Sequence, residues 1–483
     1  MRRRSNLNMA PGIVARYAAL VVVFLWGIYQ AFWNLAARDI DGDEQTYVQA
    51  GWQYVHGQFA LNQEHPPTAK YLFGLAQLVA GQGVVGPRAV VAALIVLGGA
   101  AIFWWLRREV GWWGALLAAG LWMLLPRGVP DSDGLRIDRS ATVDPVMVVF
   151  AIGAFATGWR WIRTERWYWA AASGVLMAAS VTSKVSTLVL LPAFLLLPIM
   201  FRKWRALVRG GAVWTATFLV TAILVYAPLG LHAVKYMFAF QSRHNQLGHL
   251  TSVAGTTYTH APWWANLWFM LQGMGLPVIL VLAVGVGAAI VIRPDRLVVW
   301  LGVALLLLFA FYLGYADVAL AYYYDAWTWL VSVIAGVGYA RLAAVRPRVV
   351  SLSIVAAAVV VAVAASAGVS GTVWRARPTG IARVPALLQR EAPHGGVPLV
   401  AGMSPSVYAP YLGNRATMGD SAGPYSVIID GTDPRFPLTP REQAVLRVDR
   451  AAFHRYRLDD VTVWIPDRLI ASSPSGLQVA GSH

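Results

Sequence analysis

One short part of the chain, residues 38–75, holds most of its candidates for acid–base chemistry. It contains RDIDGDEQTYVQAG and, a few residues later, NQEHPPTAKYLFGL. Five acids lie in this loop, although only 13% of the chain is charged and 58% is hydrophobic: Asp39, Asp41, Asp43, Glu44 and Glu64. The loop is therefore either a solvated acidic segment or a catalytic carboxylate site at a membrane surface.

Asp43 and Glu44 are the first catalytic candidates. They follow the first apolar segment at the expected start of a helix, and Gly42 permits a tight turn before them. A carboxylate at this position can cap the helix, act as a general base or bind a metal ion. Tyr47 follows one helical turn later and is a candidate substrate contact.

The double proline that follows Glu64 and His65 restricts the chain before a second polar helix. Because proline fixes the backbone, it sets where His65 and Lys70 point. Both are candidates for substrate binding. Lys70 either holds a phosphate near the headgroup plane or simply extends its ammonium group to the membrane surface.

Two more candidates lie at the ends of apolar segments. Asp144 directly precedes a proline, so it either caps a helix or faces Asp43 across an outer cavity. Arg136 and Arg139 lie beside it in the sequence, and Arg139 is a candidate substrate contact. Lys184 lies between two apolar segments on the side where cations are not expected, so it needs a partner, either a lipid phosphate or a carboxylate.

The loop from 231 to about 274 combines cations with aromatic residues, which suits a sugar or pyranose-phosphate pocket. The spacing of its histidines matches no standard zinc motif. A later segment, ALAYYYD, places three tyrosines and Asp325 at the mouth of a helix, where an aromatic belt explains the tyrosines. The candidate substrate contacts from these two segments are Arg243, His244, His249 and Tyr324.

Apolar segments long enough to cross a bilayer must position these residues. The 483-residue chain has a mean hydropathy of +0.54. We expect about eleven spans, near 13–36, 87–106, 112–126, 141–159, 167–183, 186–201, 211–230, 275–292, 297–315, 322–340 and 349–370. The fold class is therefore a mainly α, polytopic membrane protein, with interfacial helices in its first outer loop.

The net charge of +16 does not indicate a nucleic-acid-binding protein, because the basic residues gather at alternate ends of the expected spans. This pattern predicts a cytoplasmic N-terminus, and the odd number of spans then places the tail outside. We expect residues 371–483 to form a small extracytoplasmic α/β or α+β domain. VPLVAGMSPSVYAPYLG, YSVIIDG and VTVWIP are typical of strands, and IARVPALLQREAP of a helix.

Five motifs in order resemble one family: GDE-x-x-Y, HPP, TVDP, TSK-V-S and GHL…G…APWW. The chain from about 10 to 340 resembles the polyprenyl-phosphate-dependent GT-C glycosyltransferases, among them the dolichyl-phosphate-mannose protein mannosyltransferases and the bacterial aminoarabinose transferases that modify lipid A. The resemblance implies that residues 1–370 form a transmembrane glycosyltransferase domain, in the cell or inner membrane of a bacterium.

The same resemblance implies roles for individual residues. Asp43 would be the base that activates an acceptor hydroxyl, with Glu44 beside it and Asp144 as the second acid. Lys184 would contact the carrier phosphate. His65 stands where the aminoarabinose transferases often have lysine, and ALAYYYD departs from the family pattern around Tyr324.

The implied reaction is sugar transfer from a polyprenyl-phosphate donor to a protein, lipid or glycan hydroxyl on the extracytoplasmic face, with inversion at the anomeric carbon. No cofactor is required, although Asp43, Glu44 and Asp144 could bind a divalent metal if they converge. The alternatives are a transporter or flippase for lipid-linked glycans and a non-catalytic membrane assembly protein. Nearly uncharged spans argue against a transporter, and the acidic loop argues against an assembly protein.

Overall fold

The structure, a computed structural model, describes residues 11–40, 42–129, 136–395, 397–403, 405–413, 416, 427–433, 437–448 and 450–470. The chain forms two compact units. The first contains the residues up to Leu35 together with Thr46–Arg375. The second contains Ala36–Gln45 and the chain from Ala376 onwards, so part of the acidic loop belongs to the C-terminal unit.

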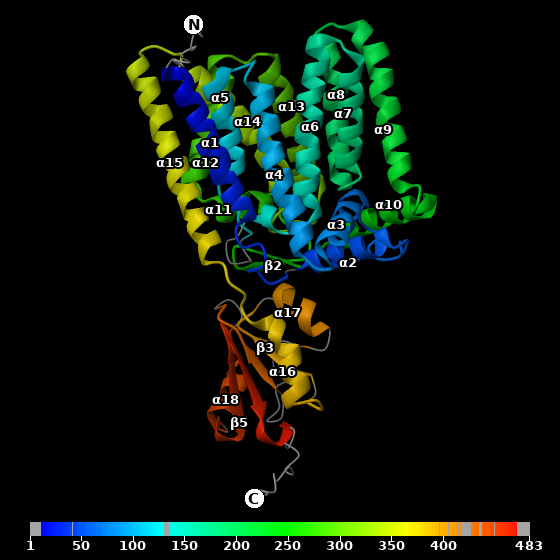
Figure 1. Cartoon of the computed structure of the whole chain (residues 1–483), viewed down its shortest axis with the longest axis vertical. Coiled ribbons are helices and arrows are strands. Elements are labelled where there is room, and N and C mark those ends of the chain that lie inside the picture. Colours follow the sequence, from blue (N-terminus) through cyan, green and yellow to red (C-terminus); the bar gives the residue numbers. More distant parts are fainter. Residues whose placement is uncertain are drawn as a thin grey trace, which may run out of the picture. The chain divides into compact units, whose positions relative to one another are not determined.

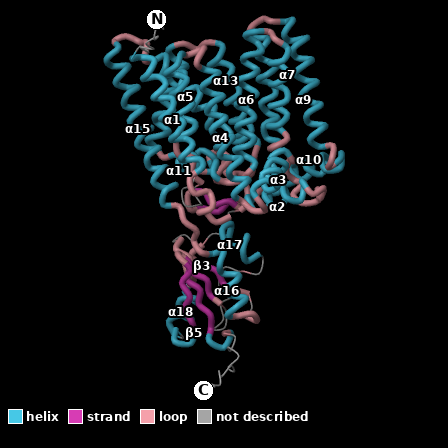
Figure 2. Tube along the Cα trace, viewed as in Figure 1, coloured by secondary structure: helices cyan, strands magenta, loops and turns pink. Residues whose placement is uncertain are grey.

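The first unit is a helical bundle (Figures 1 and 2). Within the described residues, six segments are long and apolar enough to cross a bilayer: α1 (Pro11–Phe32), α4 (Val85–Leu106), α6 (Val143–Thr164), α9 (Gly211–Tyr226) with the preceding turn Ala206–Gly210, α13 (Arg296–Phe309) with the following turn Ala310–Tyr315, and α15 (Arg348–Arg375). A seventh is formed if α11 (Ala265–Met274) and α12 (Leu276–Ile292), bent by 109°, make one span.

Shorter apolar helices complete the bundle: α5 (Gly111–Leu124), α7 (Trp167–Val181), α8 (Leu191–Met200) with the preceding turn Val185–Leu190, and the buried α14 (Asp325–Leu342). Each of the eleven predicted segments coincides with helix. The number that crosses the membrane stays a prediction.

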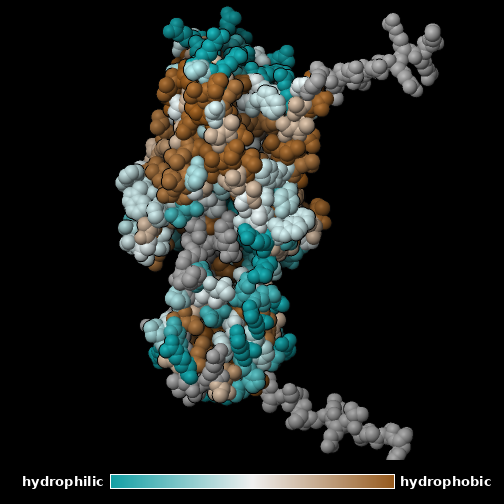
Figure 3. Space-filling model, turned by 90° about the vertical axis from the view of Figure 1, so that its left-hand side faces the viewer, coloured by the Kyte–Doolittle hydropathy of each residue, from teal (hydrophilic) through white to brown (hydrophobic). Residues whose placement is uncertain are grey.

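The outer surface of the bundle is apolar. A belt of hydrophobic side chains covers much of it in Figure 3, next to a hydrophilic end. Large exposed hydrophobic residues lie on α1, α9, α12 and α15, including Val22, Leu224, Val291 and Val360. Apolar patches of this extent are not stable in water, so the surface is suited to lipid.

Small residues allow the central helices to approach closely. A side chain added at Gly338 of α14 would overlap the carbonyl of Gly285 on α12, and one added at Gly336 would overlap Ala118 on α5. Lipid supplies no hydrophobic force between helices, so close packing of this kind holds such bundles together.

Three more polar helices, α2 (Asp43–Val55), α3 (Thr68–Ala80) and α10 (Gly230–Leu247), gather at one end of the bundle (Figure 1). α2 and α3 are the two helices predicted for the first outer loop. They cross where Gly51 meets Gly74, and neither position has room for a side chain. A hairpin of β1 (Thr251–Val253) and β2 (Thr256–Tyr258) follows α10.

The second unit is a small α+β fold. Its four-stranded sheet has the order β3 (Leu399–Ala401), β4 (Ile428–Asp430), β6 (Val461–Pro466), β5 (Phe453–Leu458); β3 and β4 are parallel, and the other pairs are antiparallel. The helices are α16 (Val384–Glu391), α17 (Pro405–Leu412) and α18 (Pro440–Val448). The segment PSVYAPYL, predicted as part of a strand, instead forms α17, which begins at Pro405, and proline is well tolerated at the start of a helix.

Residues 36–45 are fastened to this unit by specific hydrogen bonds. The Asp39 carboxylate accepts from the Thr379 backbone N–H at 2.8 Å and from its hydroxyl at 2.6 Å. The Ile40 N–H donates to the Tyr411 hydroxyl at 2.7 Å. One of the five acids of the loop, Asp39, is thus explained by a structural role.

Candidate functional site

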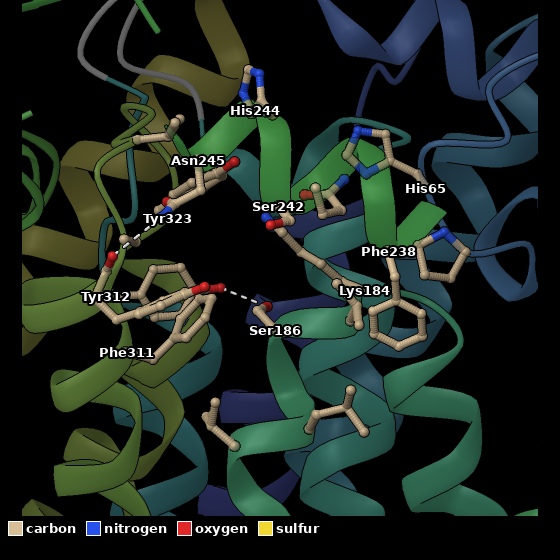
Figure 4. Close-up of a pocket in the computed structure, with 18 residues that line it drawn as sticks. His65, Lys184, Ser186, Phe238, Ser242, His244, Asn245, Phe311, Tyr312 and Tyr323 are labelled. Carbon is tan, nitrogen blue, oxygen red and sulfur yellow. Dashed lines mark hydrogen bonds between the residues drawn. The ribbon is translucent and has the colours of Figure 1, made fainter. Parts of the chain in front are cut away.

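A cavity of about 280 Å³ opens in the first unit between the α7–α8 connection, α10, the turn after α13 and the loop before α3 (Figure 4). This volume is close to the lower limit of small-molecule sites, about 300 Å³. None of the described residues that line it is acidic, whereas Lys184 and two histidines do line it. The residues that carry its chemistry are His65, Lys184, Ser186, His244, Tyr312 and Tyr323. The cavity is therefore suited to an anion.

Lys184 is the principal cation of the cavity. Its Nζ donates to Asp144 Oδ1 at 2.6 Å and lies 3.9 Å from the ring centre of Tyr323. The Asp144 side chain is almost fully buried, and a buried cation is tolerated when such a carboxylate compensates it. Of the two partners left open by the sequence, the carboxylate is therefore present, and the lysine still borders a cavity that could admit a phosphate.

Asp144 has a different place from the one expected. It is the second residue of α6 and not its cap, because the helix begins at Val143 after Thr142. Its carboxylate is directed to Lys184, so its clearest function is to hold that ammonium group in place.

His65 borders the cavity from the loop before α3. Its ring packs edge-on against Tyr47, with ring centres 5.4 Å apart. The neighbouring Glu64 carbonyl accepts a hydrogen bond from Gln241 of α10 at 2.8 Å, which joins this loop to the opposite wall. Burial lowers the pKa of His65 to about 3, and the charges of Lys70 and Lys184 add to the effect. His65 is therefore neutral near pH 7 and can offer a hydrogen bond but no charge.

The remaining polar groups come from distant parts of the chain. The Ser186 hydroxyl lies 2.8 Å from the Tyr312 hydroxyl across the cavity floor (Figure 4). Asn245 of α10 accepts a hydrogen bond from the Asp317 N–H at 2.9 Å, which fixes the opposite rim. His244 stacks on Phe240. The sequence analysis did not name Tyr312 and Asn245 as candidates, and Ser186 entered it only as the last residue of the TSK-V-S motif.

An apolar groove of about 430 Å³ adjoins the cavity. The two share Val185, Leu188 and Phe238, and the groove continues between α9 and α10. Its lining is almost entirely apolar, including Phe218, Leu219, Ile223 and Leu231. A polar cavity that continues into an apolar groove fits an amphiphile with an anionic head and a hydrocarbon chain.

Lys70 has a structural position. It is fully buried, and its Nζ donates to the His65 carbonyl at 2.7 Å, the Tyr54 hydroxyl at 3.2 Å and both the side-chain and backbone oxygens of Asn62. Burial lowers the pKa of Lys70 to about 7, and the charge of Glu64 opposes this. Because Lys70 does not line the cavity, it supports the His65 loop and does not take the place of a phosphate-binding lysine.

Arg139 and Tyr324, two other binding candidates, are also directed into the protein. The buried Arg139 guanidinium donates to the Gln30, Ala31 and Trp33 carbonyls at the C-terminal end of α1. Such carbonyls lack partners within a helix, so the arginine caps it. The buried Tyr324 hydroxyl donates to the Gly128 carbonyl at 2.7 Å.

A buried ionic cluster that the sequence analysis did not recognise lies nearby. Asp138 accepts hydrogen bonds from Arg127 and Arg136, and Arg127 Nε lies 3.5 Å from Asp325. Burial alone would raise the pKa of Asp138, but Arg136 and Arg127 outweigh it and lower the pKa to about 2. The alternating charges of RIDR were its only signal in the sequence. None of these residues lines the cavity.

The last candidates lie on helix surfaces or in the second unit. Arg243 and His249 are exposed and do not line the cavity. Asp43 and Glu44 begin α2 within the residues assigned to the second unit; Asp43 is exposed and Glu44 is buried. Asp41 lies outside the described residues. In the part of the chain that the structure describes, no three His, Asp or Glu residues gather as metal ligands.

Comparisons with known proteins place this architecture. Residues 64–232 match the family described as dolichyl-phosphate-mannose-protein mannosyltransferase. The fold resembles ArnT from Cupriavidus metallidurans bound to undecaprenyl phosphate, with a TM-score of 0.58 and 15% identity over 94% of this chain and 97% of that one. No curated protein matches the sequence.

The fold also resembles that of the oligosaccharyltransferase AglB from Archaeoglobus fulgidus in complex with an inhibitory peptide and a dolichol-phosphate. The TM-score is 0.55, with 10% identity over 97% of this chain and 75% of that one. The fold is that of the polytopic GT-C membrane glycosyltransferases. Together with the match over residues 64–232, it supports the GT-C superfamily.

Proposed function

We propose that this protein transfers a sugar from a polyprenyl-phosphate donor to an acceptor hydroxyl at the extracytoplasmic surface of a bacterial membrane. The observation that carries the proposal is the cavity beside Lys184 together with the apolar groove that adjoins it. A phosphate beside Lys184 and an isoprenoid chain along the groove would match both environments. The proteins of similar fold were solved with undecaprenyl phosphate and dolichol-phosphate, which supports a carrier of this class.

The chemistry is a displacement at the anomeric carbon. The acceptor oxygen forms a bond to that carbon while the bond to the phosphate oxygen breaks, and the phosphate leaves with the electron pair on the polyprenyl carrier. Lys184 stabilises the charge that develops on this leaving group, because a fixed cation in a poorly solvated site is most effective where charge appears. The Ser186 hydroxyl and the neutral His65 ring lie on the same cavity as hydrogen-bonding groups. A single displacement inverts the anomeric centre, and it requires no metal.

The acceptor proton needs a base. Asp144 is unsuited, since its carboxylate is buried and bound to Lys184. We assign the role to Asp43, whose side chain is exposed at the start of α2, and whose motif resembles the loop-one acid of the GT-C family. Tyr47, one turn further along α2, holds the ring of His65 at the cavity.

The acceptor is a hydroxyl of a protein, a lipid or a glycan; a peptide accompanies the archaeal enzyme of similar fold. In the proposed topology the N-terminus is cytoplasmic and the second unit is extracytoplasmic, where it could select the acceptor. Its hydrogen bonds to residues 36–45 support this role, because they attach that unit directly to the chain that leads to Asp43.

The test is transfer from labelled polyprenyl-phosphate sugars by membranes that contain the full chain. Asp43→Asn should lower transfer about a hundredfold or more, in the range of general-base removal. Asp467→Asn is the matched control, since Asp467 is exposed in the second unit, after β6, and away from the cavity. Equal activity of Asp43→Asn and wild type would refute the base. If wild type transfers sugar from no donor but moves lipid-linked glycan across vesicle membranes, the protein is a transporter and the enzyme assignment is refuted.

A further inference from the structure

A second polar cavity lies at the other end of α6. It has a volume of about 110 Å³ and is lined by the last turns of α4 and α6 and by the turn that follows α4. Asp144 lies near the start of α6, and the α6 residues that line the second cavity, 156–163, follow it by about 18–28 Å of helix. The far end of this range is close to the hydrocarbon thickness of a bilayer, about 30 Å. The second cavity therefore lies towards the opposite end of α6 from the Lys184–Asp144 pair.

The charge of this cavity is positive. Arg108, Arg160 and Arg163 line it against a single acid, Glu109. Arg108 and Arg163 are exposed, whereas Arg160 is half-buried, with its guanidinium 6.0 Å from the ring centre of Trp104. The half-buried arginine is thus held in place, and the exposed ones can close over a bound anion.

Three buried N–H groups of its lining residues lack an acceptor. Arg160 Nε and the indole nitrogens of Trp105 and Trp159 form no hydrogen bond with any residue that the structure describes. Both tryptophans are only 4% exposed, and their rings are fixed against Trp300. A buried donor without a partner costs about 1–3 kcal/mol and calls for an explanation, of which a bound ion is one.

We propose that this cavity binds the phosphate of an anionic membrane lipid. The phosphate would pair with the arginines, which suit phosphate geometry. The source is a lipid and not a soluble phosphate, because the site lies at the ends of two helices long enough to span a bilayer. Trp104 and Trp169 also meet there, with ring centres 5.7 Å apart, and tryptophan is enriched at membrane–water interfaces. The site is distinct from the Lys184 cavity and does not depend on sugar transfer.

The experiment measures lipid binding to the purified full chain by native mass spectrometry, with phosphatidylglycerol and phosphatidylcholine as probes. Arg160→Gln combined with Arg163→Gln should weaken phosphatidylglycerol binding about tenfold or more, as expected for the loss of charged hydrogen bonds. Arg107→Gln combined with Arg202→Gln removes the same charge outside the cavity and should leave the binding near the wild-type value.

One further variant separates binding from folding. Arg160→Lys keeps the charge and should bind with intermediate affinity. Equal binding by the cavity and control double variants would overturn the proposal. Tighter binding of soluble glycerophosphate than of phosphatidylglycerol, with the same sensitivity to Arg160, would overturn the lipid assignment.

Discussion

The ion pair between Lys184 and Asp144 allows a sharp test of how the carrier phosphate is bound. We consider Lys184→Met, Asp144→Asn and the double variant. The two side chains meet at 2.6 Å in a buried setting. Removing one partner of such a pair destabilises a protein by about 3–5 kcal/mol, chiefly because the other charge is left buried. Both single variants should therefore have a lower Tm, and the double variant should recover part of the loss.

Carrier binding should follow a different pattern from stability. A charged hydrogen bond to phosphate contributes about 1.5–3 kcal/mol, so Lys184→Met should weaken polyprenyl-phosphate binding about 10- to 150-fold. Asp144→Asn removes a negative charge next to the phosphate position and should bind the carrier at least as tightly as wild type. The double variant should be as weak as Lys184→Met, although it is more stable.

The assay is titration of the purified protein with polyprenyl phosphate, together with thermal unfolding of the same samples. Lys235→Met is the matched control, because Lys235 is exposed on α10 and does not line the cavity. Two results would refute the reasoning. One is wild-type affinity in folded Lys184→Met. The other is weakened binding in Asp144→Asn equal to that in Lys184→Met, which would mean that Lys184 binds the phosphate only while Asp144 holds the ammonium group in place.

Three more predictions follow from single contacts. His65→Gln should lose less stability than wild type as the pH falls from 6.5 to 5. In wild type the unfolded chain binds a proton at His65 in this range, whereas the folded chain, in which the pKa of His65 is lowered, does not. The difference in the free energy of unfolding reaches about 2 kcal/mol at pH 5 and is measured by unfolding both proteins at each pH. Leu188→Trp should fill the shared wall of cavity and groove and raise KM for a long-chain donor, whereas a short-chain donor should be used normally. Thr379→Val should remove one hydrogen bond to Asp39 and destabilise the second unit by about 1–3 kcal/mol, which limited proteolysis within residues 36–45 would detect; unchanged protection would count against that contact as an anchor.

The two lysines of the candidate site show where the sequence was sufficient. Lys184 was identified because a cation at an apolar turn on the outer side needs a partner, and the structure supplies Asp144. Lys70 looked equally suitable from the sequence, yet it lies inside its own loop, bound to Asn62 and His65. Nothing in the neighbouring residues distinguishes the two, because both follow a polar turn and precede an apolar segment.

Residue types and spacing by themselves determined the helical segments, the polar helices α2 and α3, and, in the second unit, strands β3, β4 and β6 with helix α16. These features depend on local hydropathy and periodicity, which the chain carries wherever it folds. Only the tertiary structure decided which side chains share the cavity. Ser186 and Tyr312 are 126 positions apart, and their pairing depends on how α8 and α13 pack. It also decided that residues 36–45 join the C-terminal unit, since hydrogen bonds across 340 positions leave no local signal.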